Sequence, residues 1–169
     1  MRDILEVCES LHMGGSPGIT ADFIGKSSIW VENTYEKEET DLVKRILYEA
    51  VTKTAPGQLS VIGYDSDLSG IFAPFSALSS GGEKVLKLIQ NEEELKTYLG
   101  YIRQNIQSVQ NVIQGREETL TRFRRNTGRA VEGYTLVVLS LDMGVLDEEI
   151  RAKLAMLMRR GPASGVTFL

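Results

Sequence analysis

The sequence is poor in the residues that build disulfides, metal sites and nucleophilic catalytic groups. Its 169 residues include one cysteine, Cys8, and one histidine, His12. A single cysteine excludes an internal disulfide framework and fits a reducing compartment. His12 precedes a glycine-rich stretch and has no candidate partner, so neither a catalytic dyad nor a metal-ligand spacing is present. We expect a protein without a resident metal.

Long apolar runs and an excess of positive charge are also absent. No apolar run approaches the length that crosses a bilayer, and no signal-peptide pattern opens the chain. Lys and Arg number 19 against 23 Asp and Glu, which gives a formal net charge of −4. This balance argues against a basic nucleic-acid clamp. The hydrophobic fraction of 42% and the charged fraction of 25% indicate one globular domain, which we expect to be cytoplasmic and not membrane-bound.

A glycine-rich phosphate loop is missing where an ATPase core would need it. A strand is predicted over Ser27–Glu32 and a helix over Asp41–Thr54. The connecting residues 33–40 read NTYEKEET, with no glycine and with three carboxylates in the place of a polyphosphate. Acids suit a helix N-terminus, but here they occupy the position of the anion. Residues 25–28 imitate the end of a phosphate loop, yet they open a strand, and Thr20 replaces the first glycine of that pattern.

Strand and helix patterns alternate along the chain, which predicts an α/β fold with a mainly parallel sheet flanked by helices. Residues 1–18 are predicted to form an N-terminal helix, over Arg2–Leu11, and a linker. Residues 19–169 are predicted to form one domain with a long helical segment at about 91–127. The other predicted elements are strands at Leu59–Tyr64, Val85–Ile89, Tyr134–Asp142 and Gly165–Leu169 and a helix at Leu146–Arg160. Because the last strand ends the chain, we expect it to be the final strand or the sequence to belong to a longer protein.

The long helical segment carries a heptad seam. Asn91 followed by three glutamates is typical of a helix start. A break is expected at Gly115–Arg116 and an end at Asn126–Gly128. Such a seam either packs on its own domain or pairs with a partner as a projecting arm, and both interpretations stay open. The seam residues are Leu95, Leu99, Ile102, Ile106, Val109 and Ile113.

Acidic residues at two strand ends are candidate nucleotide-site residues. Leu136–Asp142 has the form of a Walker B strand, whose acid holds the water shell of a metal. The glutamate that normally follows is absent, because Met143 stands beside Asp142. Asp65 and Asp67 follow a neighbouring strand, and ligands bind outside the carboxyl ends of such strands. The alternative is that all these acids only form turns.

Four arginines near the end of the helical segment are candidate DNA contacts. Basic residues also suit a helix C-terminus, where they complement the helix dipole. The arginines are Arg122, Arg124, Arg125 and Arg129.

A series of short segments occurs in a defined order between Asp41 and the C-terminus. In sequence they are Arg45–Leu47 with Ala55–Leu59; Ile62–Asp65 with Gly70, Phe72, Ala73, Pro74 and Phe75; Tyr101–Arg103, Phe123–Arg124 and Asn126–Gly128; Tyr134–Val138 with Asp142; and Gly161 with Ser164–Val166. In that order they resemble motifs of the FtsK/SpoIIIE (HerA–FtsK) superfamily of DNA-translocase ATPases. The resemblance covers roughly three quarters of the chain.

The resemblance implies a RecA-like, P-loop NTPase-like fold. The phosphate loop and the Walker B glutamate are missing, so the resemblance implies a degenerate, non-catalytic ATPase-like domain. Such a domain would belong to a larger DNA translocase, for example the ATPase of a phosphorothioation-dependent restriction system. ATP and Mg would then belong to the parent protein, with no cofactor in this domain. The implied partners are other domains or subunits of the same ATPase, in a homo-oligomer, and DNA through the parent protein. Two alternatives stay open: an ATP-binding motor with a non-standard phosphate loop, and a protein-interaction module that uses the heptad seam.

Overall fold

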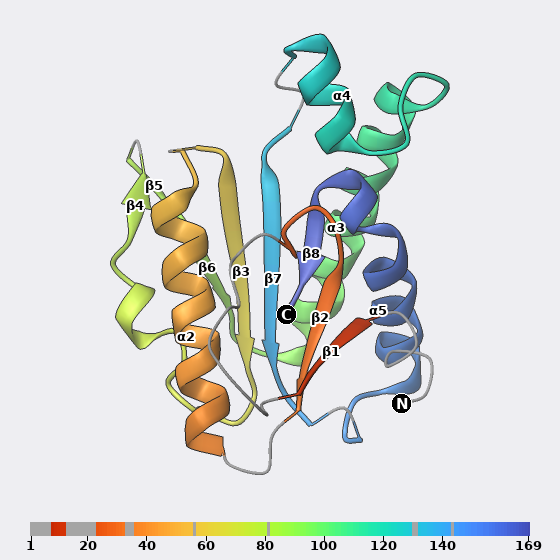
Figure 1. Ribbon diagram of the computed structural model, residues 1–169. Coiled ribbons are helices and arrows are strands. Elements are labelled where there is room, and N and C mark those ends of the chain that lie inside the picture. Colours follow the sequence, from red (N-terminus) through yellow and green to blue (C-terminus); the bar gives the residue numbers. More distant parts are fainter. Residues whose placement is uncertain are drawn as a thin grey trace.

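The computed structural model describes residues 8–12, 23–32, 36–55, 57–80, 82–129, 132–142 and 144–169. It is an α/β fold in which helices cover both faces of a parallel sheet (Figure 1). The elements are β1 (Cys8–His12), β2 (Ser28–Glu32), α2 (Glu36–Lys53), β3 (Leu59–Asp65), η2 (Ala73–Phe75), β4 (Ser79–Ser80), β5 (Glu83–Lys84), β6 (Leu86–Ile89), α3 (Glu92–Ile113), α4 (Leu120–Thr127), β7 (Tyr134–Ser140), α5 (Glu148–Arg160), η3 (Pro162–Ser164) and β8 (Val166–Phe168).

The main sheet has four parallel strands in the order β6-β3-β7-β8. Its central strands β3 and β7 pair from Leu59 with Tyr134 to Asp65 with Ser140. They are rich in apolar residues because both of their faces are buried. Helix α2 packs on one face, and α3 and α5 pack on the other. The strands predicted at 59–64, 85–89, 134–142 and 165–169 are thereby confirmed, and so is the α/β class.

Strand β2 extends this layer beyond β8. The Ser28 hydroxyl accepts a hydrogen bond from the Phe168 amide at 3.3 Å and donates to the Met158 carbonyl at 3.3 Å. The Gly25 amide donates to the Thr167 hydroxyl at 2.8 Å. Strand β1 pairs in parallel with the other edge of β2. The strand predicted at 27–32 therefore stands next to β8, so that β8 separates it from β7.

Two sequence predictions on the first part of the chain are wrong in detail. Residues 8–12 form strand β1, not the end of an N-terminal helix. A helix of about ten residues is marginal on its own, whereas pairing with β2 satisfies the backbone of these residues. The remainder of that predicted helix lies outside the described residues. Helix α2 begins at Glu36, five residues before the predicted Asp41, because acidic side chains favour a helix N-terminus.

The heptad seam lies in the core of its own chain. All six seam residues are buried at 5% exposure or less. The helix start at Asn91 is confirmed, since its side-chain oxygen accepts a hydrogen bond from the Glu94 amide at 2.9 Å. The expected break follows at once, because α3 ends at Ile113 and Gly115 adopts a φ of 75°. Leu95, Leu99, Ile102 and Ile106 pack on the sheet, whereas Val109 and Ile113 pack with residues of α4. The seam is therefore packed within its own chain, and its pairing with a partner stays a prediction.

Candidate functional site

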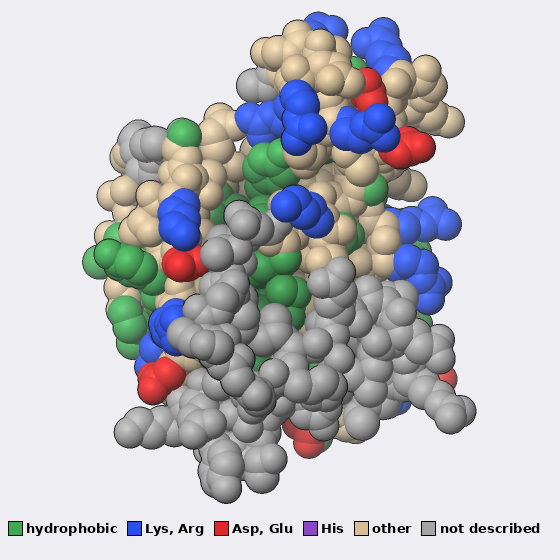
Figure 2. Space-filling view, in the orientation of Figure 1, with side chains coloured by type: hydrophobic (Ala, Val, Ile, Leu, Met, Phe, Trp, Pro, Cys, Tyr) green, Lys and Arg blue, Asp and Glu red, His purple; other side chains and the backbone are tan. Residues whose placement is uncertain are grey.

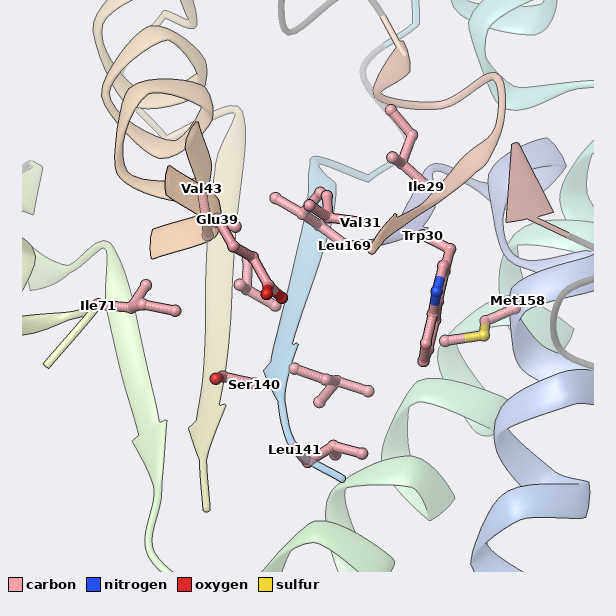
Figure 3. A pocket seen from close by; sticks show the side chains of 12 residues that line it. Ile29, Trp30, Val31, Glu39, Val43, Ile71, Ser140, Leu141, Met158 and Leu169 are labelled. Atoms are coloured by element: carbon pink, nitrogen blue, oxygen red, sulfur yellow. The ribbon is translucent and has the colours of Figure 1, made fainter. Parts of the chain in front are cut away.

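A pocket lies among β2, β7, β8 and the first turns of α2 (Figure 3). Its cavity has a volume of about 90 Å³. Its position near the carboxyl ends of parallel strands is where ligands bind in folds of this type. The lining residues are Ile29, Trp30, Val31, Glu39, Val43, Ile71, Val138, Leu139, Ser140, Leu141, Met158 and Leu169. The polar side-chain groups of the wall are one carboxylate, one hydroxyl and the indole nitrogen of Trp30. The rest of the wall is apolar.

Glu39 supplies the carboxylate. It lies in the second turn of α2, and Figure 3 shows its oxygens directed into the pocket. Residues 33–40 have the length of the phosphate-loop pattern, which ends in Gly-Lys-Ser/Thr. This chain has Glu38, Glu39 and Thr40 at those three places. A negative side chain thus faces the pocket from the position at which the pattern requires a lysine.

The end of β7 lacks an acid that faces the pocket. The strand ends at Ser140, and Ser140 and Leu141 line the pocket. Asp142 lies beyond them in an exposed turn, where its Oδ1 accepts a hydrogen bond from the Gly144 amide at 2.7 Å. The predicted Walker B acid is therefore a turn residue, and the strand end presents a hydroxyl to the pocket.

The two acids after β3 also hold a turn. Asp65 accepts hydrogen bonds from the Ser69 amide at 3.0 Å, the Ser69 hydroxyl at 3.1 Å and the Gly70 amide at 3.1 Å. Asp67 accepts one from the Ser66 hydroxyl at 3.1 Å. Neither acid lines the pocket. Within the described ranges, no three His, Cys, Asp or Glu residues are grouped as metal ligands would be.

Sequence reasoning located the acidic segment but missed most of the pocket. It did not single out Trp30, the one tryptophan of the chain, whose buried indole nitrogen has no hydrogen-bond partner in the described structure. Nor did it single out Ser140 or Leu141. The available signal was the length of residues 33–40, which aligns Glu39 with the lysine of the phosphate-loop pattern.

The four arginines divide into two pairs. Arg122 contacts Glu118 at 3.0 Å and Glu117 at 3.7 Å. Arg124 donates to the Glu132 carbonyl at 3.1 Å and to the Gln58 side chain, and its guanidinium lies 5.2 Å from the centre of the Tyr134 ring. Arg124 therefore stabilises the junction of α4 with β7, whereas Arg122 pairs with acids of the loop that precedes α4.

Arg125 and Arg129 differ from the first pair. Both are exposed, and neither forms an ion pair with any residue that the structure describes. The DNA contact predicted for this arginine cluster stays a prediction.

No protein-family model matches the chain, and no curated protein matches it. Among solved structures, the chain is similar to EssC (ATPases 2 and 3) from Geobacillus thermodenitrificans, with a TM-score of 0.63 and 15% identity. The match covers 77% of this chain and 25% of that chain, so this chain spans about a quarter of its length. At this identity the similarity establishes the fold alone, which is that of a RecA-like, P-loop ATPase-like domain. In addition, none of the described helices has both the length and the apolar character of a membrane span.

Proposed function

We propose that this chain is a non-catalytic ATPase-like domain of an FtsK-type DNA translocase, with a structural or partner-docking role. One observation carries the proposal. The fold retains a pocket near the carboxyl ends of its strands, but the pocket is lined by apolar side chains and receives the Glu39 carboxylate from α2. The DNA, ATP and Mg of this proposal belong to the parent protein, together with the other domains or subunits that this domain would contact.

The charge at the pocket disfavours a nucleotide phosphate. A nucleotide phosphate is held by backbone amides, a lysine and a metal ion. Here the side chain in the lysine position is negative, and like charges about 4 Å apart repel by about 4 kcal/mol at an effective dielectric constant of 20. The candidate metal acids Asp65, Asp67 and Asp142 do not line the pocket. The Glu39 carboxylate would therefore repel a phosphate, and none of these three acids is placed in the pocket wall to hold a metal ion beside it.

Isothermal titration with Mg-ATP tests the proposal against the alternative of an ATP-binding motor with a non-standard phosphate loop. The wild-type chain and Asp142→Ala are titrated in parallel, with circular dichroism as the folding control. We expect no saturable heat from either protein at millimolar ligand. A saturable heat from the wild type that Asp142→Ala abolishes would support the motor instead.

A further inference from the structure

Strand β8 ends before the two strands that flank it. On the β7 side, the Leu169 amide donates to the Val137 carbonyl and the Leu139 amide donates to the Leu169 carbonyl, both at 2.8 Å. Because β7 continues to Ser140, its end reaches beyond β8. Odd-numbered residues of β7 face β8 in this pairing, so the next residue to face that edge is Leu141.

Strand β2 also runs past the end of β8. Its first residue, Ser28, contacts the Phe168 amide, and the strand continues in the same direction to Glu32. Neighbouring strands lie about 4.8 Å apart, so two strands that flank a third lie about 10 Å apart. Beyond Leu169, the ends of β2 and β7 therefore border a slot with the width of one strand. The pocket lies in this slot (Figure 3).

The walls of the slot come from both faces of the sheet. Trp30, Leu139, Leu141 and Met158 belong to the core on the side of α3 and α5 or pack against it. A cavity beside one face of a sheet would be lined from one core alone. This cavity therefore lies within the layer of strands. The lining residues from the core on the side of α2 are Ile29, Val31, Val43, Ile71, Val138 and Leu169.

Two polar groups in the slot suit an extended polypeptide. The buried indole nitrogen of Trp30 has no hydrogen-bond partner in the described structure, whereas most buried polar groups have one. The Glu39 carboxylate is directed into the slot, and a carboxylate has about four acceptor sites. A strand placed here would offer backbone carbonyls to the indole and a side-chain donor to the carboxylate.

Charge disfavours a polyanion as the occupant of the slot. Glu39 is the one charged side chain of the wall, and it is negative. Figure 2 shows Lys and Arg side chains gathered over and below α4. Helix α4 precedes β7 and lies at its amino end, whereas the slot lies at its carboxyl end. That concentration of positive charge is therefore remote from the slot, and the neutral backbone of a peptide fits the slot better than nucleic acid does.

We propose that an extended segment of the parent protein inserts between β7 and β2, in line with β8. The segment would pair with the exposed edge of β7 and add a parallel strand to the layer, as in other cases of strand addition. This inference rests on the proposed function, because the larger protein supplies the segment, and it defines the chemistry of the partner that docks here.

The alternation of β8 defines the side chains that the segment needs. Val166 and Phe168 belong to the core beside α3 and α5, whereas Leu169 belongs to the core beside α2. Successive side chains of a strand point to opposite faces. The first residue of the segment then faces Trp30 and is apolar. The second faces the side of Glu39 and carries a hydrogen-bond donor, such as lysine.

A chain extended after Leu169 tests the proposal, because the added residues reach the slot at high effective concentration. One extension, Val-Lys-Val-Thr, follows the pattern. The control, Lys-Val-Thr-Val, has the same composition but is one residue out of register. In urea denaturation, the first extension should raise the equilibrium constant for folding about tenfold or more, since two valine side chains become buried. The control should unfold like the wild type, and acrylamide should quench Trp30 less in the first extended chain alone.

Glu39→Gln adds a second measurement. The gain from the Val-Lys-Val-Thr extension should be smaller in this variant than in the wild type, a comparison that cancels the effect of the substitution on the unextended chain. A gain of equal size would overturn the assigned pattern of side chains.

Equal urea midpoints for the wild type and the Val-Lys-Val-Thr chain would overturn the proposal, and so would equal stabilisation by both extensions. Either result would leave the proposed function standing, because the Mg-ATP titration tests that function separately. Saturable heat with Mg-ATP would instead overturn the proposed function and assign the slot to a nucleotide.

Discussion

Glu39 and Ser140 line one pocket from elements that are far apart in the sequence. Glu39 comes from the second turn of α2, and Ser140 ends β7. In the phosphate-loop and Walker B patterns these two elements supply a lysine and an acid. Here one element supplies an acid and the other a hydroxyl. The charge at the lysine position is thus inverted and the acid at the end of β7 is lost, while the sheet that supports the pocket is kept.

Ser28 joins β2 to the main sheet, so its removal should destabilise the chain. Ser28→Ala leaves the buried Phe168 amide without its hydrogen-bond acceptor. We expect the free energy of unfolding to fall by about 1–3 kcal/mol. Urea denaturation measures the change, and Ser60→Ala, at an exposed position on β3, is the control. Equal stability of the two variants would argue against the contact between β2 and β8.

The seam on α3 should behave as core. Leu99 is fully buried, and Leu99→Ala removes side-chain volume against the sheet. We expect a loss of about 2–5 kcal/mol in unfolding free energy. Gln107→Ala, on the exposed face of the same helix, should change stability little. If Leu99→Ala kept full stability, the seam would be free to serve a partner.

The Asn91 side chain begins α3, and its loss should cost less than a core substitution. Asn91→Ala removes the hydrogen bond to the Glu94 amide. Loss of such a cap costs about 1 kcal/mol, so a small downward shift of the thermal midpoint is expected. Asn111→Ala, at an exposed position in the last turn of α3, is the matched control and should leave the midpoint unchanged.

Much of this architecture could be predicted from sequence because it follows from local patterns. The apolar runs of β3 and β7, the cap at Asn91 and the break at Gly115 each depend on a few neighbouring residues. The partner of β1 could not be predicted, because a five-residue strand is defined by its pairing with β2 and not by its own pattern. The predicted start of α2 is too late for a related reason, because acidic residues are common in loops but also favour the first turn of a helix.

The site was harder to predict than the fold. The acids at Asp65 and Asp142 match strand-end motifs, but their hydrogen bonds stay within their own turns. Which side chain faces a pocket depends on where α2 crosses the sheet. That crossing is set by packing on β3 and β7, and a single sequence does not show it. Trp30 and Leu141 were missed because apolar lining residues have no spacing signature.

Relief of backbone strain at Leu68 should stabilise the monomer. Leu68 has a φ of 53°. Asparagine adopts this left-handed conformation more readily than leucine, so Leu68→Asn should raise the free energy of unfolding by up to about 1 kcal/mol. Urea denaturation measures this change. Leu88→Asn, in strand β6, is the comparison and should lower stability, because asparagine is disfavoured in strands. A loss of stability at Leu68 would mean that its side chain is held by a contact.

The fluorescence of Trp30 tests the central claim most directly. Trp30 lines the pocket and is the one tryptophan in the sequence, so its emission reports on this site without labelling. The chain is titrated with Mg-ATP to about 1 mM, a concentration that half-saturates a site with a binding free energy of about −4.1 kcal/mol. Excitation at the red edge of the indole band avoids absorption by adenine. We predict an unchanged emission spectrum, and a saturable change in intensity or wavelength would contradict the account.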